Sequence, residues 1–208
     1  MSRPLTALAV LAAFAVTLAA APAPSDSAPA YIDLQPQANV KLKDDFHSGT
    51  YAGNNLAKLP TGKQTLGGVK FNVGESLIQL GSSQVAGKPD KVEGIKVGRT
   101  LKKLHFLHAC GHRAEDDTVI AKYVVHYDDN TTEDIEVVYG KDVVDWWVQP
   151  GVADPTRGKV AWEGQNRLSP VKLFLTTWTN PHPDKRIVAL DYVATKNAPF
   201  CVAITAEE

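Results

Sequence analysis

The stretch Ile120–Val138, with the sequence IAKYVVHYDDNTTEDIEVV, decides the fold class of this chain. Its two ends are rich in Val, Ile and Tyr, which favour strands, and the Asp-Asn pair between them tolerates the left-handed backbone of a tight turn. Side chains of an extended chain alternate between two faces, so Ala121, Tyr123, Val125 and Tyr127 share the more apolar face. The stretch predicts a β-hairpin with one face directed to the core.

Short segments of the same character recur along the rest of the chain. Examples are GGVKFNVG at 67–74, VEGIKVG at 92–98, LKKLHFLHAC at 101–110 and VKLFLTTW at 171–178. Gly, Pro, Asn and Asp separate these segments, and no window of about twelve residues beyond the N-terminal region has the 3.6-residue period of an amphipathic helix. The pattern predicts an all-β chain, organised as a two-sheet antiparallel β-sandwich.

The N-terminal region has a different composition. Met1–Arg3 is basic, Leu5–Ala20 is apolar, and small residues follow. The apolar run is shorter than the roughly 20 residues of a membrane-spanning helix, and the order of features is that of a secretory signal peptide. We expect a signal peptide over 1–23, a Pro/Ser/Ala-rich linker over 24–30 and a β-sandwich domain over 31–208. The expected location is secreted or periplasmic, with no membrane insertion after signal cleavage.

The charge balance limits the class of partner. The 208 residues include 22 Lys+Arg and 23 Asp+Glu, which gives a formal net charge of −1. A protein that grips nucleic acid carries a basic patch or stripe, and this sequence has no block of Lys and Arg. We therefore expect no nucleic-acid partner.

Common enzyme signatures are missing from the sequence. It has no G-x-S-x-G elbow, no P-loop, no G-x-G-x-x-G and no H-E-x-x-H. A glycosidase needs two carboxyl groups across a cleft, and the sequence alone selects no pair among its 23 acidic residues. Asp145 and Glu163 are the pair to include first in a mutational screen. We expect a protein that is not an enzyme.

The two cysteines, Cys110 and Cys201, allow two interpretations. In an oxidising compartment they could form one disulfide that closes a long loop, worth about 4 kcal/mol. Both also stand in apolar contexts, FLHAC and APFCVAI, and free Cys is among the most buried residue types. The sequence leaves a disulfide and two buried thiols as open alternatives.

Three longer stretches resemble a known class of domain. They are Tyr31–Val73, which begins YIDLQPQANVKLKDDF, Leu104–Trp147, which ends YVVHYDDNTTEDIEVVYGKDVVDWW, and Val160–Val193, which ends LFLTTWTNPHPDKRIVALDYV. Together they resemble galactose-binding-like β-sandwich domains of secreted bacterial proteins, which are often appended to glycoside hydrolases. The resemblance implies a jelly roll that serves as a carbohydrate-binding or interaction module. The segment HSGTYAGNNL at 47–56 departs from the family, which tends to carry a Trp-Thr-Asp-Gln-Gly-like loop before NNL.

The resemblance also implies one structural calcium ion near the first strands. The oxygen ligands available there are Asp33, Asp44, Asp45, Asn54 and Asn55. The alternative is that these side chains accept hydrogen bonds from their own backbone. No EF-hand or other calcium-binding spacing is present.

Trp146 and Trp147 are adjacent, so in an extended chain one packs inward and the other points outward. Asp145 precedes them in GKDVVDWWVQP. An exposed indole can stack on the apolar face of a sugar while a neighbouring carboxylate bonds to its hydroxyls. The alternative is that both Trp side chains seal the end of the sandwich.

Trp178 ends a predicted strand and leads into TNPHPDK. The two prolines restrict the residues before them, so the loop is stiff and presents Asn180 and His182 as a ready-made binding edge. The alternative is a rigid turn whose polar groups cap their own backbone. Trp162, beside Glu163, is a third and weaker candidate.

The histidines do not predict a zinc site. His105 and His108 fall on opposite faces of one predicted strand, so they cannot bind the same ion. His108 shares its face with Leu104 and Phe106, where a neutral, hydrogen-bonded core histidine is the default and a ligand at the floor of a pocket is the alternative.

The sequence therefore favours a secreted, non-catalytic module that binds carbohydrate or a cell-surface glycan. The predicted binding residues are Trp147, Asp145, Trp178, Asn180 and His182, with Trp146 and His108 beneath them. A second hypothesis is a structural or protein-interaction domain of the cell surface with a secreted protein partner. A small glycoside hydrolase that uses Asp145 and Glu163 ranks last.

Overall fold

A computed structural model describes residues 29–47, 51–83 and 85–208. The predicted signal peptide, and the linker as far as residue 28, lie outside the described residues. Within the described ranges, no helix has the length and apolar character that crossing a membrane requires.

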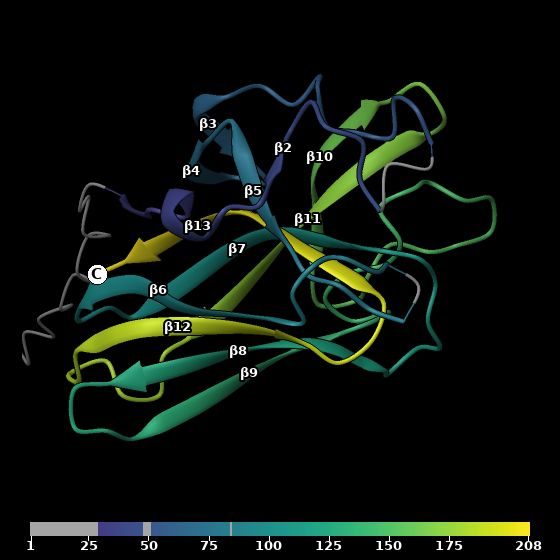
Figure 1. The fold of residues 1–208 in the computed structure, drawn as a ribbon. Coiled ribbons are helices and arrows are strands. Elements are labelled where there is room, and N and C mark those ends of the chain that lie inside the picture. Colours follow the sequence, from purple (N-terminus) through teal and green to yellow (C-terminus); the bar gives the residue numbers. More distant parts are fainter. Residues whose placement is uncertain (1–28, 48–50, 84) are drawn as a thin grey trace, which may run out of the picture.

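The larger sheet holds seven strands in six positions (Figure 1). Its order is β10-β11-β7-β13-β5-β2, and β1 pairs with the C-terminal half of β13 while β5 pairs with the N-terminal half. Its strands are β1 (Ala30–Ile32), β2 (Val40–Lys41), β5 (Ser76–Gln79), β7 (Lys103–Gly111), β10 (Lys159–Gln165), β11 (Pro170–Thr179) and β13 (Ala198–Glu207). The sheet curls strongly, which leaves its two ends facing different directions.

The smaller sheet has four strands in the order β6-β12-β8-β9 and packs against one face of the larger sheet (Figure 1). Its strands are β6 (Lys91–Arg99), β8 (Val119–Tyr127), β9 (Thr132–Val138) and β12 (Ile187–Ala194). A separate hairpin, β3 (Gly62–Leu66) and β4 (Val69–Val73), and a short 3₁₀ helix, η1 (Gln35–Gln37), complete the elements. All pairs of named strands are antiparallel, so the prediction of an all-β, sandwich-like fold is confirmed.

The predicted hairpin forms from β8 and β9. Asn130 lies in the turn with φ 65°, the left-handed conformation that the sequence indicated. Tyr123 and Val125 are fully buried, as the alternation predicts. Ile120 is also fully buried, although the alternation places it on the outer face, because a register shift between Val119 and Ala121 turns it inward.

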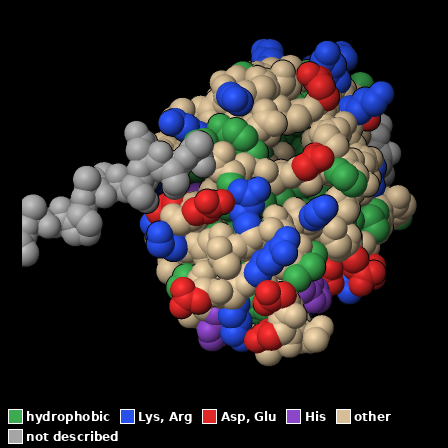
Figure 2. Space-filling model, turned by 90° about the vertical axis from the view of Figure 1, so that its left-hand side faces the viewer, with side chains coloured by type: hydrophobic (Ala, Val, Ile, Leu, Met, Phe, Trp, Pro, Cys, Tyr) green, Lys and Arg blue, Asp and Glu red, His purple; other side chains and the backbone are tan. Residues whose placement is uncertain are grey.

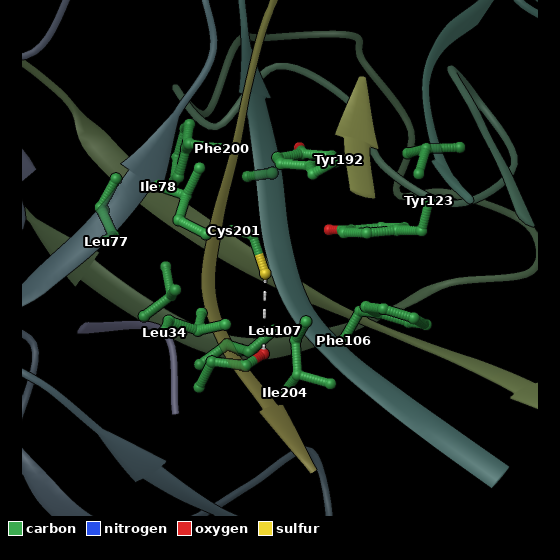
Figure 3. Packing of buried hydrophobic residues seen from close by; sticks show 14 of the residues in the cluster. Leu34, Leu77, Ile78, Phe106, Leu107, Tyr123, Tyr192, Phe200, Cys201 and Ile204 are labelled. Carbon is green, nitrogen blue, oxygen red and sulfur yellow. Dashed lines mark hydrogen bonds between the residues drawn. The ribbon is translucent and has the colours of Figure 1, made fainter. Parts of the chain in front are cut away.

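Stacked aromatic rings fill the space between the two sheets. The ring centroids of Phe106 and Tyr123 are 4.2 Å apart, and those of Tyr123 and Tyr192 are 4.4 Å apart (Figure 3). Phe106 comes from the larger sheet, whereas Tyr123 and Tyr192 come from the smaller one. Each ring is buried, which removes a large apolar area from water and holds the layers together.

The two long sides of the sandwich are built differently. On one side η1 covers the edge of β6, and Gln37 Nε2 donates to the carbonyl oxygen of Gly94 at 3.1 Å. On the other side β10 reaches only as far as Lys159, which lies opposite Leu175. Residues Thr176–Thr179 of β11 therefore pair with β7 alone, and this side of the sandwich stays open between β11 and the edge strand β9.

The two cysteines are free thiols, so the structure does not contain the disulfide that the sequence allowed. Cys110 lies opposite Pro199, and Cys201 lies opposite His108, which makes the two cysteines diagonal neighbours on β7 and β13. Diagonal Cα atoms are about 7–8 Å apart, beyond the usual span of a disulfide. Cys110 Sγ donates to the carbonyl oxygen of Val144 at 3.4 Å, and Cys201 Sγ donates to that of Ala203 (Figure 3).

Charged side chains of both signs share the surface. On the face shown in Figure 2, acidic side chains lie among the basic ones. This mixture agrees with the near-zero formal net charge of the chain.

Candidate functional site

A groove of about 480 Å³ lies along the open side of the sandwich. We call it the β9–β11 groove. One wall is the β9 segment from Asp134 to Val138, and the other is Thr176–Thr179 of β11. Lys141, Asp142 and Arg157 from the β9–β10 loop complete it. The groove exists because β11 extends beyond the start of β10.

Trp178 supplies the aromatic surface of this groove. It lies opposite Leu104 of β7, and its indole is half-buried against the edge of the core. Of the predicted binding residues, Trp178 is the one that lines the groove. A partly exposed indole held by its own strand is pre-set for stacking, because little side-chain entropy remains to be lost on contact.

A buried ion pair fixes the position of Arg157. The Asp142 side chain is fully buried, and the Arg157 side chain is 55% exposed. Arg157 Nε donates to Asp142 Oδ1 at 2.6 Å, and Nη2 donates to Oδ2 at 2.5 Å. Asp142 Oδ2 also accepts from the backbone N–H of Val138 at 2.8 Å. The bidentate pair ties the end of the long β9–β10 loop to β9 and holds the guanidinium at the groove.

His108 lies beneath the groove rather than in it. Its Nε2 is 2.8 Å from Oγ1 of Thr176, which lines the groove, and its Nδ1 is 3.4 Å from the hydroxyl of Tyr123. Burial lowers the pKa of His108 to about 4, so the imidazole is neutral at pH 7. His108 is a core histidine that positions Thr176, not a group that a ligand in the groove can touch.

Trp147 and Asp145 lie at the other end of β11. Trp147 forms a bridge with Val171, which is seven residues from Trp178 on the same strand, or about 23 Å. The predicted binding residues therefore belong to two separate places. A single sugar cannot stack on Trp178 and bond to Asp145 at once, so the structure does not bring the predicted binding residues together in one place.

The polar groups around Trp147 are engaged with one another. Its indole N–H donates to Asn54 Oδ1 at 2.9 Å. Asp145 accepts from the backbone N–H of Trp147 at 3.1 Å and from Gln149 Nε2 at 2.8 Å. Burial raises the pKa of the Asp145 carboxyl. This end of the sandwich is a closed network in which Asp145 orders its own loop.

Trp146 is a core residue. It is 1% exposed, and its ring stacks on Phe46 at 5.4 Å and meets Phe200 edge-on at 5.6 Å. The expectation that one Trp of the pair packs inward and the other outward is confirmed, because Trp147 remains half-exposed. With no open ring face, Trp146 has no surface to offer a sugar.

Asn180 and His182 have different environments. Asn180 is 3% exposed; its Oδ1 accepts from the Tyr127 hydroxyl at 2.7 Å, and its Nδ2 donates to the carbonyl oxygen of Leu101 at 2.9 Å. The same side chain bonds to both the N–H and the carbonyl oxygen of His182. Asn180 thus builds the turn, as its alternative interpretation held, whereas His182 is exposed with its ring against Tyr127.

The suggested calcium ligands accept hydrogen bonds from the protein. Asp33 Oδ1 bonds to the N–H of Gln35, and Asp45 Oδ1 bonds to the N–H of Gly53. Asp44 and Asn55 cap nearby backbone N–H groups in the same way. Across the described ranges, no three His, Cys, Asp or Glu side chains are grouped to hold a metal ion. The local hydrogen bonds fit the capping alternative.

Trp162 and Glu163 lie on β10. The ring of Trp162 packs over Gly164, and Glu163 is an exposed residue whose carboxylate is 3.4 Å from Lys172 Nζ. Neither side chain lines the β9–β11 groove.

Sequence reasoning missed Arg157 and Glu136 as groove residues. Both stand in segments whose patterns are those of an ordinary loop and an ordinary strand. The Arg157–Asp142 ion pair, fifteen positions apart, and backbone hydrogen bonds from residues 156–158 to Gly140 and Lys141 bring the loop back to the groove. No family model matches the chain, and a search of curated proteins found no similar sequence.

Proposed function

We propose that this chain is a secreted, non-catalytic module that binds carbohydrate in the β9–β11 groove. We further propose that its sandwich is a galactose-binding-like jelly roll. The observation that carries the proposal is the half-buried indole of Trp178 in an open groove that also holds a fixed guanidinium.

The chemistry of the groove suits a sugar. The apolar C–H face of a pyranose ring stacks on an indole, and its hydroxyls need both donors and acceptors around it. Arg157 offers donors, and the carboxylates of Asp134 and Glu136 offer acceptors at the rim of β9. Such a site has few polar contacts, so its affinity is expected in the micromolar to millimolar range.

The engagement of Asp142 supports a binding role over catalysis. A glycosidase needs one carboxyl that delivers a proton and a second that acts across the scissile bond. Asp142 is fully buried and is held by Arg157 and by a backbone N–H, so it is not free to exchange a proton with a ligand.

A glycan array with the purified protein tests the proposal. Trp178→Ala should abolish binding. Trp147→Ala should retain it, because this second half-buried Trp lies beside Val171, about 23 Å along β11 from Trp178. Thermal unfolding of both variants checks that they fold. Binding that survives Trp178→Ala but is lost in Trp147→Ala would move the site to the other end of the strand.

A second candidate function is a protein-interaction domain. Residues Thr176–Thr179 of β11 pair on one side only, and β9 is the outer strand of its sheet. Such edges can accept an added strand from a partner. A blank array from folded protein, together with a specific cross-linked partner that Pro substitution at Thr177 removes, would favour this function.

A further inference from the structure

We propose that the β9–β11 groove selects neutral sugars over acidic ones, and that it recognises a pair of adjacent hydroxyls with Arg157 as donor and Glu136 as acceptor. This inference rests on the proposed function and names the class of sugar that it concerns. It is carried by the charges that line the groove and by the fixed guanidinium.

The groove lining is slightly negative. Its charged residues are Asp134, Glu136, Lys141, Asp142 and Arg157. Both basic side chains already have acidic partners, since Arg157 pairs with Asp142 at 2.5 Å and Lys141 Nζ lies 2.6 Å from Asp117 Oδ1. A carboxylate or sulfate that enters the groove therefore meets no unpaired cation among the described lining residues.

Arg157 has donors left for a ligand. A guanidinium carries five N–H groups, and Asp142 uses one on Nε and one on Nη2. Three N–H groups remain on a side chain that is 55% exposed, and the described part of the chain provides no other acceptor for them. Because the bidentate pair fixes the plane of the guanidinium, these donors have a defined direction.

Glu136 provides the matching acceptor. It is an exposed residue of β9 that makes no hydrogen bond or ion pair within the described residues, and it lines the same groove. The charge of Glu136 also affects Arg157. The pKa of the Arg157 guanidinium is raised most by its hydrogen bond to Asp142, and the negative charge of Glu136 raises it further. A hydroxyl both donates and accepts, so two neighbouring hydroxyls can bridge this donor and this acceptor, whereas a carboxylate can only accept.

The test compares glucan and glucuronan oligosaccharides of the same linkage and length, which differ only in the carboxylate at C6. Isothermal titration with the purified protein at low salt should show the neutral oligosaccharide binding roughly fivefold more tightly, the effect of one like charge at close range in water. Glu136→Gln should remove most of this preference. Glu133→Gln, the same change on the same strand outside the groove lining, should leave it intact.

The outcomes separate this inference from the proposed function. Neutral and acidic oligosaccharides that bind equally, or a preference that Glu136→Gln leaves unchanged, would overturn the inference while carbohydrate binding stands. If neither class binds to folded protein, and the glycan array is also blank, the proposed function itself fails. High salt should reduce the preference in the parent protein, because it screens the exposed carboxylate.

Discussion

Trp146 and Trp147 are neighbours in the chain but have opposite environments: Trp146 packs between Phe46 and Phe200, while the indole N–H of Trp147 bonds to Asn54. The pair lies in the loop between β9 and β10, with Trp147 bridged to Val171, and their opposite environments assign them different roles. The Trp146 ring belongs to the core. The Trp147 indole binds the loop that contains Asn54, ninety-three positions earlier in the sequence.

Trp146→Ala should therefore destabilise the protein far more than Trp147→Ala. Removing a fully buried Trp costs about 3–5 kcal/mol, because a cavity remains where the ring was. The half-exposed Trp147 loses less buried area and one hydrogen bond. Urea unfolding of both variants measures the difference, and equal losses would contradict the assignment of Trp146 to the core.

Arg157→Ala should cost about 3 kcal/mol of stability, because it leaves the fully buried carboxylate of Asp142 without its partner. The control is Lys172→Ala, which breaks ion pairs to the exposed carboxylates of Asp154 and Glu163 and should cost less than about 1 kcal/mol. Chemical denaturation compares the two variants. A loss from Arg157→Ala no larger than the loss from the control would show that the pair does not hold the loop.

The burial of His108 predicts acid sensitivity. Its pKa is lowered from 6.5 to about 4 in the folded protein. As the pH falls below about 6.5, the unfolded chain binds a proton that the folded chain does not, so stability decreases through this window by up to about 3 kcal/mol. His47, whose pKa burial lowers to about 3, acts in the same direction.

His108→Gln should make this decline shallower, because the glutamine takes up no proton. The free energy of unfolding, measured in urea at several pH values between 7 and 4.5, compares the variant with the parent. Curves of equal slope would show that His108 does not contribute.

How far the sequence predicts this structure depends on the range of the interactions involved. The β8–β9 hairpin, its turn at Asn130 and the burial of Tyr123 follow from local alternation and turn chemistry, and they were predicted. Trp178 could also be recognised, as a large aromatic at the end of an apolar strand. The sequence predicts these features because residues close together in the chain determine them.

The groove could not be predicted in the same way. It depends on where β10 stops beside β11 and on the return of Arg157 to Asp142, and both are settled by packing between distant segments. The same limit explains why Asp145 and Trp178 were placed in one site. Sequence spacing does not show that the segment with Asp145 packs beside the start of β11, whereas Trp178 lies near the end of that strand.

Both cysteines should behave as inert thiols. Burial raises the pKa of Cys201 to about 12 and that of Cys110 well above its usual value. A thiol reagent should label neither residue in the folded protein and both in denaturant, with no reductant needed. Mass spectrometry counts the labels. A denatured chain that takes up no label until it is reduced would establish a disulfide instead.

Removal of divalent cations should leave the melting temperature unchanged, because backbone N–H groups already occupy oxygens such as Asp33 Oδ1 and Asp45 Oδ1. Asp45→Ala should cost about 1 kcal/mol through the lost bond to Gly53. Calorimetry with and without a chelator makes the measurement. A fall in melting temperature that added calcium restores would show that these oxygens bind the ion.

The pairing of Ala30 with Ala206 brings the two ends of the domain to one place on the larger sheet. From Ala30, β13 and β7 lie between β1 and β11, a distance of about three strand spacings, or 14 Å. A partner joined to the domain at Ala30 or at Ala206 would start from the same side of the larger sheet. The domain is therefore suited to display on a surface or as a fusion partner through either end.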